Sequence, residues 1–340
     1  MPSWASSLPT LIPPSPPSQQ TSPAIALSSA PLPEPAKPAT RNIVRLRTKA
    51  VIGASLIGLA LWVLSAPKTL SRNDWQDVAG NVERGEQVFN IGGCASCHME
   101  KGAKGDARLL LGGGQAFETQ FGTFYAPNIS SSESGISSWN ALDLANALLK
   151  GVSPEQTHYY PAFPYSSYTR LSQQDIADLK LFLDTLPQVD KANQPHDLPF
   201  PFNIRRSLGF WKLLFLSDAP IAENYEPRGQ YLVEGLGHCA ECHTPRNLLG
   251  GLDTARWLAG APNPEGKGRI PNLTPGGGLA EWSVEDIAYY LETGFTPDFD
   301  TAGSTMVEVI ENLSQAAPED RLAIARYLKG LPALADAPKP

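Results

Sequence analysis

The pattern of apolar and polar positions first isolates one long apolar segment near the N-terminus. An uncharged run of seventeen residues, Ala50 to Ala66, follows four basic residues between positions 41 and 49. This length is at the lower limit for crossing ~30 Å of hydrocarbon and exceeds the ~7–15 residues usual in a signal peptide. Leu64 and Pro67 make cleavage after Ala66 unfavourable. The pattern therefore predicts a membrane anchor over residues 41–66, with a signal segment as the alternative.

Beyond about residue 74 the apolar positions follow a helical period. Leu142, Ala145 and Leu148 share one face of a predicted helix that begins after Ser138 and ends at Gly151. A second helix is predicted after Ser172, which has the spacing of a capping box with Asp175. Another begins at Pro318. Strand-like alternation of useful length is absent from the sequence, so the predicted fold class is all-α.

An internal repeat organises this helical region. Corresponding positions in the two copies are Arg84-Gly85 with Arg228-Gly229, Pro127-Asn128 with Pro271-Asn272, Trp139 with Trp282, and Gly151 with Gly294. The prediction is therefore two tandem domains, residues 74–190 and 223–335, joined by a linker over residues 191–222. Residues 1–40 are rich in proline, serine and alanine and cannot bury enough apolar surface to fold, so they are predicted to be a disordered tail.

Charge narrows the class of partner. Residues 75–340 contain 20 basic against 32 acidic residues, a net charge of −12. An acidic surface argues against nucleic acid and favours docking onto basic faces of other proteins.

All four cysteines belong to two short motifs of the form Cys-x-x-Cys-His. These are Cys94, Cys97 and His98 in the first copy and Cys239, Cys242 and His243 in the second. Two thiols three positions apart can each form a thioether to a haem vinyl group, and the following histidine can then reach the iron. The sequence therefore predicts two covalently bound haem c groups, with His98 and His243 as proximal iron ligands.

Two other kinds of site use the same residue types. A zinc site built from two cysteine pairs closes a loop of about 15–20 residues, whereas these pairs are 145 residues apart. A redox dithiol of the thioredoxin kind would lie near a βαβ pattern, which the sequence lacks. Haem attachment is the better interpretation of both motifs.

Residues 75–335 resemble bacterial dihaem cytochromes c with class I folds, which are related to the multihaem cytochrome subunits of membrane-bound alcohol and gluconate dehydrogenases. The resemblance rests on the two haem motifs, Pro-Asn-Ile at 127–129, Pro-Asn-Leu-Thr-Pro at 271–275, Tyr-Pro-Ala-Phe-Pro-Tyr at 160–165 and Cys-His-Thr-Pro-Arg-Asn at 242–247. It implies two tandem class I cytochrome c domains in which the carbonyls of Pro127 and Pro271 orient the proximal histidines. The predicted number of haems, two, differs from that of the dehydrogenase subunits, which carry three.

The sixth iron ligands differ between the copies. Met306 lies twelve residues past Gly294, where class I cytochromes present their distal methionine, and it is predicted to ligate haem 2. The first copy has Phe163 at the matching position, and a phenyl ring cannot ligate iron. His158 is the nearest donor and the predicted ligand of haem 1, with His196 or an open iron as alternatives. Arg246 is a candidate partner for a haem propionate.

These features predict a dihaem electron-transfer protein, not an enzyme, which is held at the inner membrane by its N-terminal span. Its haem domains would lie in the periplasm and serve a respiratory chain. The donor would be an exported dehydrogenase, of which the chain could be a subunit, and the acceptor a terminal oxidase or soluble cytochrome. The alternative is a haem enzyme, a peroxidase or sulfur-compound oxidoreductase, with catalysis at haem 1. A haem-based sensor is a weaker third hypothesis, which rests on the N-terminal tail alone.

Overall fold

The computed structural model describes residues 13–16, 40–221, 226–263 and 268–337. The chain divides into two compact units, residues 1–55 and residues 56–340. Apart from residues 13–16, the predicted disordered tail over residues 1–40 lies almost entirely outside the described residues.

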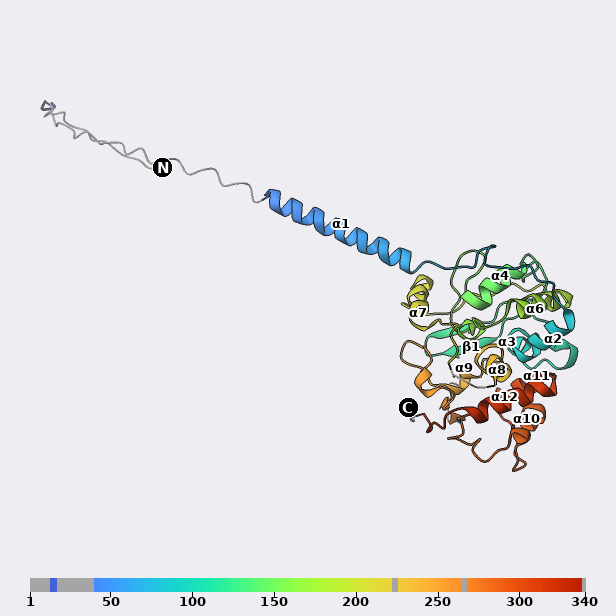
Figure 1. Ribbon diagram of the computed structural model, residues 1–340. Helices are drawn as coiled ribbons and strands as arrows, with labels where there is room; N and C mark the ends of the chain where they lie inside the picture. Colours follow the sequence, from blue (N-terminus) through green and yellow to red (C-terminus); the bar gives the residue numbers. More distant parts are fainter. Residues whose placement is uncertain (1–12, 17–39, 222–225, 264–267, 338–340) are drawn as a thin grey trace, which may run out of the picture. The chain divides into compact units, whose positions relative to one another are not determined.

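The N-terminal apolar segment forms helix α1, Thr40–Leu64 (Figure 1). Its stretch Ile43–Leu64, 22 residues long, has the length and composition to cross a membrane, and a signal sequence would satisfy the same test. The helix extends ten residues ahead of the apolar run because Thr40 to Lys49 have no helix-breaking residue among them.

The haem motifs lie in the unit formed by residues 56–340, in two sets of elements that we call the first half and the second half. The first half comprises α2 (Val82–Ile91), α3 (Cys94–His98), η1 (Gly105–Leu109), β1 (Ala116–Thr119), β2 (Gly122–Tyr125), α4 (Ala141–Ala145), η2 (Asn146–Lys150), α5 (Tyr165–Tyr168) and α6 (Gln173–Thr185). The second half comprises α8 (Pro227–Gln230), η4 (Tyr231–Leu236), α9 (Ala240–His243), η5 (Thr254–Arg256), β3 (Ala261–Pro262), β4 (Arg269–Ile270), α10 (Val284–Thr293), α11 (Met306–Leu313) and α12 (Pro318–Gly330). Between them lie η3 (Arg205–Ser207) and α7 (Leu208–Phe215).

Local signals in the sequence account for several helix boundaries. Ser172 caps α6 by accepting a hydrogen bond from the backbone N–H of Asp175, and α12 begins at Pro318, as predicted. Gly151 ends the helical segment α4–η2 in a left-handed conformation, again as predicted. The predicted cap at Ser138 is wrong by two residues, because Asn140 and Asp143 form a reciprocal capping box and start the helix there.

The two halves are mostly helical but not entirely α. Strands β1 and β2 pair antiparallel, and so do β3 and β4. Each hairpin has only two to four residues in a strand, and the first strand of the longer hairpin, β1, is exposed throughout. Such short segments carry too little alternation for the sequence pattern to predict them. The all-α expectation is corrected to this extent.

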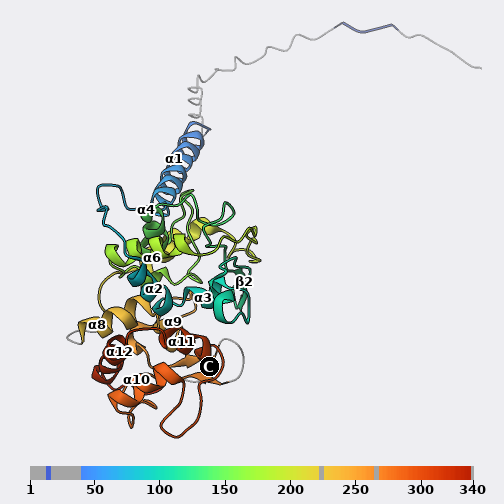
Figure 2. The same ribbon diagram turned by 90° about the vertical axis from the view of Figure 1, so that its right-hand side faces the viewer.

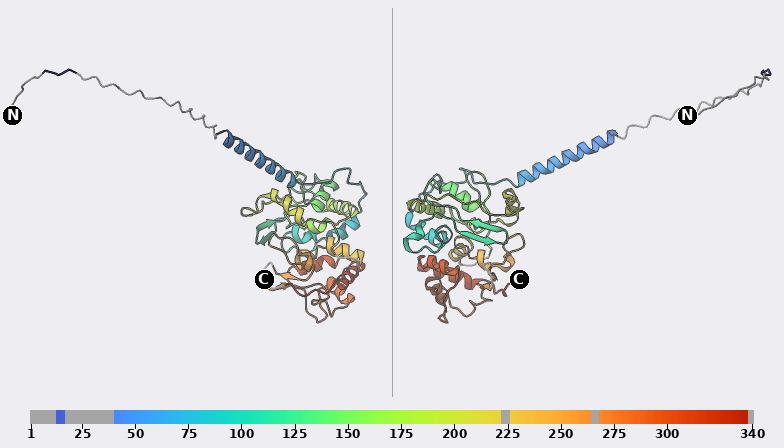
Figure 3. Two further views of the ribbon diagram at one scale, coloured as in Figure 1. Left: turned by 60° about the vertical axis from the view of Figure 1, so that its left-hand side comes forward. Right: turned by 180° about the vertical axis from the view of Figure 1, so that it is seen from behind.

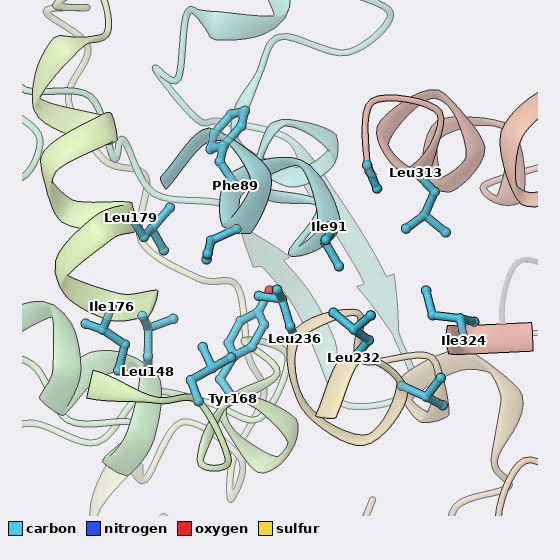
Figure 4. Packing of buried hydrophobic residues seen from close by; sticks show 14 of the residues in the cluster. Phe89, Ile91, Leu148, Tyr168, Ile176, Leu179, Leu232, Leu236, Leu313 and Ile324 are labelled. Carbon is cyan, nitrogen blue, oxygen red and sulfur yellow. The ribbon is translucent and has the colours of Figure 1, made fainter. Parts of the chain in front are cut away.

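One hydrophobic core runs through both halves. Figure 4 shows Phe89, Leu148 and Leu179 from the first half in the same cluster as Leu232 and Ile324 from the second. The teal elements of the first half, which include α2 and α3, lie next to the second half, whose elements are yellow to red, in the views of Figures 2 and 3. Helix α11 contacts α2, and α5 contacts η4, so each half packs one helix against the segment that precedes the other half's haem motif.

A close helix crossing recurs in both halves. Helix α2 packs on α6 through Gly85, and α8 packs on α12 through Gly229. A Cβ atom at Gly85 would lie 2.1 Å from the carbonyl oxygen of Asp178, and one at Gly229 would lie 2.1 Å from that of Ala323. The repeated Arg-Gly pair therefore marks the point at which two backbones approach too closely for any side chain.

Candidate haem sites

Each Cys-x-x-Cys-His motif contains a short helix, and a residue in the left-handed conformation precedes the first cysteine. Gly93, with φ of 63°, precedes Cys94, and His238, with φ of 39°, precedes Cys239. The second copy therefore has a histidine in a conformation that favours glycine. His238 Nε2 lies 3.2 Å from the carbonyl oxygen of Gly92, and His238 is half-buried between the halves.

The four thiols have no disulfide partner in the described structure, and Cys97 and Cys242 are exposed. Burial raises the pKa of Cys94 and of Cys239 to about 12, which is opposite to the lowered pKa of a redox-active dithiol. Within the described residues, no group of three or more His, Cys, Asp or Glu side chains is arranged to hold a metal ion. The geometry therefore gives no support to a redox dithiol or a zinc site.

The proximal histidines have the same contact in both halves. His98 Nδ1 lies 2.7 Å from the carbonyl oxygen of Pro127, and His243 Nδ1 lies 2.7 Å from that of Pro271. Since a carbonyl only accepts, Nδ1 carries the proton and Nε2 has a lone pair for iron. Burial lowers the pKa of both imidazoles, which favours the neutral form that metals bind. These residues fit a haem held by two thioethers and one axial histidine.

Two asparagines that the sequence analysis did not single out hold the proline carbonyls in place. Asn128 Nδ2 donates to Val189 O at 2.7 Å, and Asn272 Nδ2 donates to Leu334 O at 2.8 Å. Both asparagines are buried, and their Oδ1 atoms accept from the backbone N–H two residues further along the chain. The repeated Pro-Asn pair was the available signal, but only its proline had been given a role.

Replacing Asn272 with alanine is expected to lower the free energy of unfolding by about 2 kcal/mol, because buried partners lose their hydrogen bonds. The loosened Pro271 carbonyl should also shift the reduction potential of haem 2 while leaving haem 1 unchanged. Denaturant unfolding and spectroelectrochemistry measure the two effects. Asn73, which is exposed, provides the control substitution. If haem 2 has the same reduction potential in the Asn272 variant and in the Asn73 control, Asn272 does not position the Pro271 carbonyl.

The structure gives no support to the expectation that His158 supplies the sixth ligand of haem 1, which stays untested. His158 is buried, with Nε2 3.0 Å from the carbonyl oxygen of Ser65 and Nδ1 3.0 Å from Lys212 Nζ. The carbonyl of Ser65 only accepts, so Nε2 carries the proton and Nδ1 accepts from the Lys212 amine; both ring nitrogens are engaged in this arrangement. Lys212 Nζ also donates to Lys150 O and Gly151 O at 2.7 Å each. Sequence spacing could not predict this because the partners are 54 and 93 residues away.

Replacing His158 with alanine is therefore expected to leave the optical and EPR spectra of haem 1 unchanged. The free energy of unfolding should fall by about 2 kcal/mol, since Ser65 O loses its partner and Lys212 loses an acceptor. Thermal unfolding monitored in the far ultraviolet gives the second quantity. Glu155→Ala, at an exposed position in the same loop, is the matched control. A changed ligand field at haem 1 would restore His158 as a candidate ligand.

The remaining predicted site residues have these positions. Met306 begins α11, is half-buried and packs against the core; ligation of haem 2 by Met306 stays a prediction. His196 Nδ1 accepts from the backbone N–H of Tyr125 at 3.2 Å. Arg246 pairs with Glu241 and donates to Gly250 O at 2.8 Å. A contact between Arg246 and a haem propionate stays a prediction, and its Nε–H or its second Nη1–H would have to make that contact.

The two attachment motifs contribute directly to the interface between the halves. Ser96 Oγ, inside the first motif, accepts from Asn312 Nδ2 at 2.8 Å. At the equivalent position of the second motif, Glu241 Oε1 accepts from Ser166 at 2.9 Å and from Ser167 at 3.2 Å. Each motif is thus hydrogen-bonded to a helix of the other half, the first to α11 and the second to α5.

Charged and aromatic groups extend this interface. Arg108 donates to Asn312, and Lys104 pairs with Glu311. The His238 ring of the second half lies edge-on to Tyr168 of the first, with centroids 5.6 Å apart. Because these contacts involve residues next to the two motifs, the interface fixes the two attachment sites relative to each other.

Comparisons with known proteins agree with this geometry. The Cytochrome c family matches residues 82–187. A dihaem c-type cytochrome of Cereibacter sphaeroides is 53% identical over 298 residues, covering 85% of this chain and 100% of that protein. The fructose dehydrogenase cytochrome subunit of Gluconobacter japonicus is 37% identical, covering 75% of this chain and 54% of its own length. The cytochrome c subunit of the quinone-dependent alcohol dehydrogenase of Gluconobacter oxydans is 33% identical, covering 74% and 55%.

The chain thus spans about half the length of these dehydrogenase subunits but the full length of the dihaem cytochrome. Its two attachment motifs, each with a histidine oriented by a proline carbonyl, provide the chemistry that such a relationship requires. The chain belongs to the cytochrome c family and is a dihaem member of it, with covalently bound haem c at two sites.

Proposed function

We propose that the two halves are tandem class I cytochrome c domains, residues 74–190 and 223–335, which together pass electrons between partner proteins. The haem iron supplies one-electron oxidation and reduction when it is bound. Cys94, Cys97, Cys239 and Cys242 would hold the two haems by thioether bonds, and His98 and His243 would ligate their irons.

The observation that carries the proposal is the interface formed by the motifs themselves. Ser96 and Glu241 each lie between the two cysteines of a motif and each hydrogen-bonds to the opposite half. Redox centres attached on either side of such an interface are held close, without a flexible linker between them. Direct transfer between the two haems is what this arrangement supports.

Other features of the chain support a membrane anchor and particular classes of partner protein. Helix α1 supports an anchor in the inner membrane with the haem domains in the periplasm. The net charge of −12 over residues 75–340 supports docking onto basic protein surfaces. The relatives that are named as dehydrogenase cytochrome subunits support a dehydrogenase as donor. The acceptor would be a terminal oxidase or a soluble cytochrome of a respiratory chain.

Rapid mixing of the reduced, full-length protein with an oxidised, basic soluble cytochrome c tests this function. Both haems should be oxidised in a second-order reaction whose rate falls as ionic strength rises, since opposite charges steer the encounter. Oxidation by peroxide together with no reaction with the cytochrome would contradict the carrier role. It would favour the second candidate function, a haem enzyme, for which Phe163 in place of a distal methionine is the specific observation.

A further inference from the structure

The distal loops of the two halves share one backbone register. Val152 pairs with His158 in the first half, and Phe295 pairs with Thr301 in the second. The residue after each pair donates to the loop's glycine: Tyr159 N–H to Gly151 O at 2.7 Å, and Ala302 N–H to Gly294 O at 2.9 Å. Both glycines are left-handed, with φ of 59° and 80°. The structure therefore aligns the loops independently of the sequence spacing.

Counting five residues on from His158 and from Thr301 reaches Phe163 and Met306. Both side chains are half-buried and pack against the shared hydrophobic core. Phe163 lies edge-on to the rings of Tyr159 and Tyr168, with centroids 5.8 Å away in each case. Where the second half offers a thioether sulfur, the first half thus offers a phenyl ring, which has no lone pair to donate to iron.

The other described methionine and the remaining histidines make contacts elsewhere in the protein. Met99 is buried directly after the proximal His98, on the attachment helix's C-terminal side. Both ring nitrogens of His158, Nδ1 of His196 and Nε2 of His238 take part in the contacts described above.

Two further side chains near this loop are unsuited to bind iron. Burial raises the pKa of the Tyr159 hydroxyl, so the phenolate form that binds ferric haem is disfavoured. Lys212 is held by His158 and by the carbonyls of Lys150 and Gly151.

We propose that haem 1 keeps its sixth coordination position for an exogenous small ligand, a neutral diatomic molecule such as carbon monoxide or nitric oxide, at the side of the haem that Phe163 covers. The aromatic surroundings of Phe163 favour a neutral ligand over a hydrated anion, because burying an unpaired charge beside apolar rings is costly. This proposal rests on attachment of haem 1 at Cys94, Cys97 and His98. It extends the proposed function by giving the two haems different chemistry.

The test compares the wild type with Phe163→Met and Met306→Phe, using carbon monoxide as the probe. The wild type should take up one carbon monoxide per two haems after reduction, and one of its two ferric haems should be high-spin by EPR. Phe163→Met should abolish uptake and add a second thioether-to-iron charge-transfer band. Met306→Phe should double uptake, to two per chain.

Different outcomes would contradict the open coordination position of haem 1 and the attachment of haem 1 itself. Two covalent haems that are both low-spin and bind no carbon monoxide would overturn the open position. Unchanged uptake in Phe163→Met would overturn the assignment of Phe163 to the distal side. One haem per chain in the wild type, measured as the pyridine haemochrome, would instead contradict attachment at the first motif. If Phe163→Met does not fold, the wild-type stoichiometry and EPR still decide.

Discussion

Replacing Gly85 with valine is expected to prevent the first half from folding around its haem. Even the Cβ of alanine would lie 2.1 Å from Asp178 O and 2.7 Å from Phe182 Cβ, so α2 would have to move away from α6. Overpacking of this kind costs about 1–3 kcal/mol for modest insertions, and here the obstacle is backbone that cannot rotate aside. Gly85→Ala should lower the free energy of unfolding by about 3 kcal/mol. Gly85→Val should lower it by more than the whole free energy of unfolding of a typical domain.

Thermal unfolding and covalent haem content measure this effect. Gly229→Val should have the same consequence for the second half, since its Cβ would lie 2.1 Å from Ala323 O. Gly278→Ala is the matched control, because no atom lies within 4 Å of the Cβ it would add. Equal melting temperatures for Gly85→Ala and Gly278→Ala would show that α2 and α6 do not cross as closely as described.

Replacing Cys94 and Cys97 together with alanine is expected to halve the covalent haem content, from two haems per chain to one. The remaining haem would be haem 2 and should keep its spectrum and its potential. Oxidation by a soluble cytochrome should then yield one electron per chain. The pyridine haemochrome assay and haem staining after denaturing electrophoresis give the haem count.

The matched pair, Cys239→Ala with Cys242→Ala, should retain haem 1 alone. That variant isolates the spectrum of haem 1 from the stronger low-spin signal expected of a methionine-ligated haem 2. Retention of both haems in either double variant would contradict thioether attachment at the replaced motif.

The sequence predicted most reliably what depends on local chemistry. The caps at Ser172 and Gly151 and the start of α12 at Pro318 were correct because each depends on residues within a few positions. Covalent haem at two sites could be predicted because Cys-x-x-Cys-His contains attachment and ligation within five residues. The match of Phe163 to Met306 was found by counting, and the paired loop bridges agree with it.

What the sequence could not predict depends on partners far along the chain. His158 was taken for an iron ligand because histidine is a good donor and lies in the right loop. Its contacts with Ser65, which follows α1, and with Lys212 in the linker exist only in the folded chain. The role of Asn128 likewise depends on Val189, 61 residues away. The hairpins were missed because strands of two to four residues leave no periodic signal.

The contacts of Ser96 and Glu241 across the interface also affect how many electrons the protein can hold at one time. Dehydrogenases remove electrons from their substrates in pairs, whereas a single haem accepts only one. Two haems fixed within one compact unit can together store both electrons of a single turnover before either leaves. With unequal iron ligands the two haems would differ in reduction potential and would be reduced in a set order. The protein would then accept two electrons from a two-electron donor and pass them singly to one-electron acceptors.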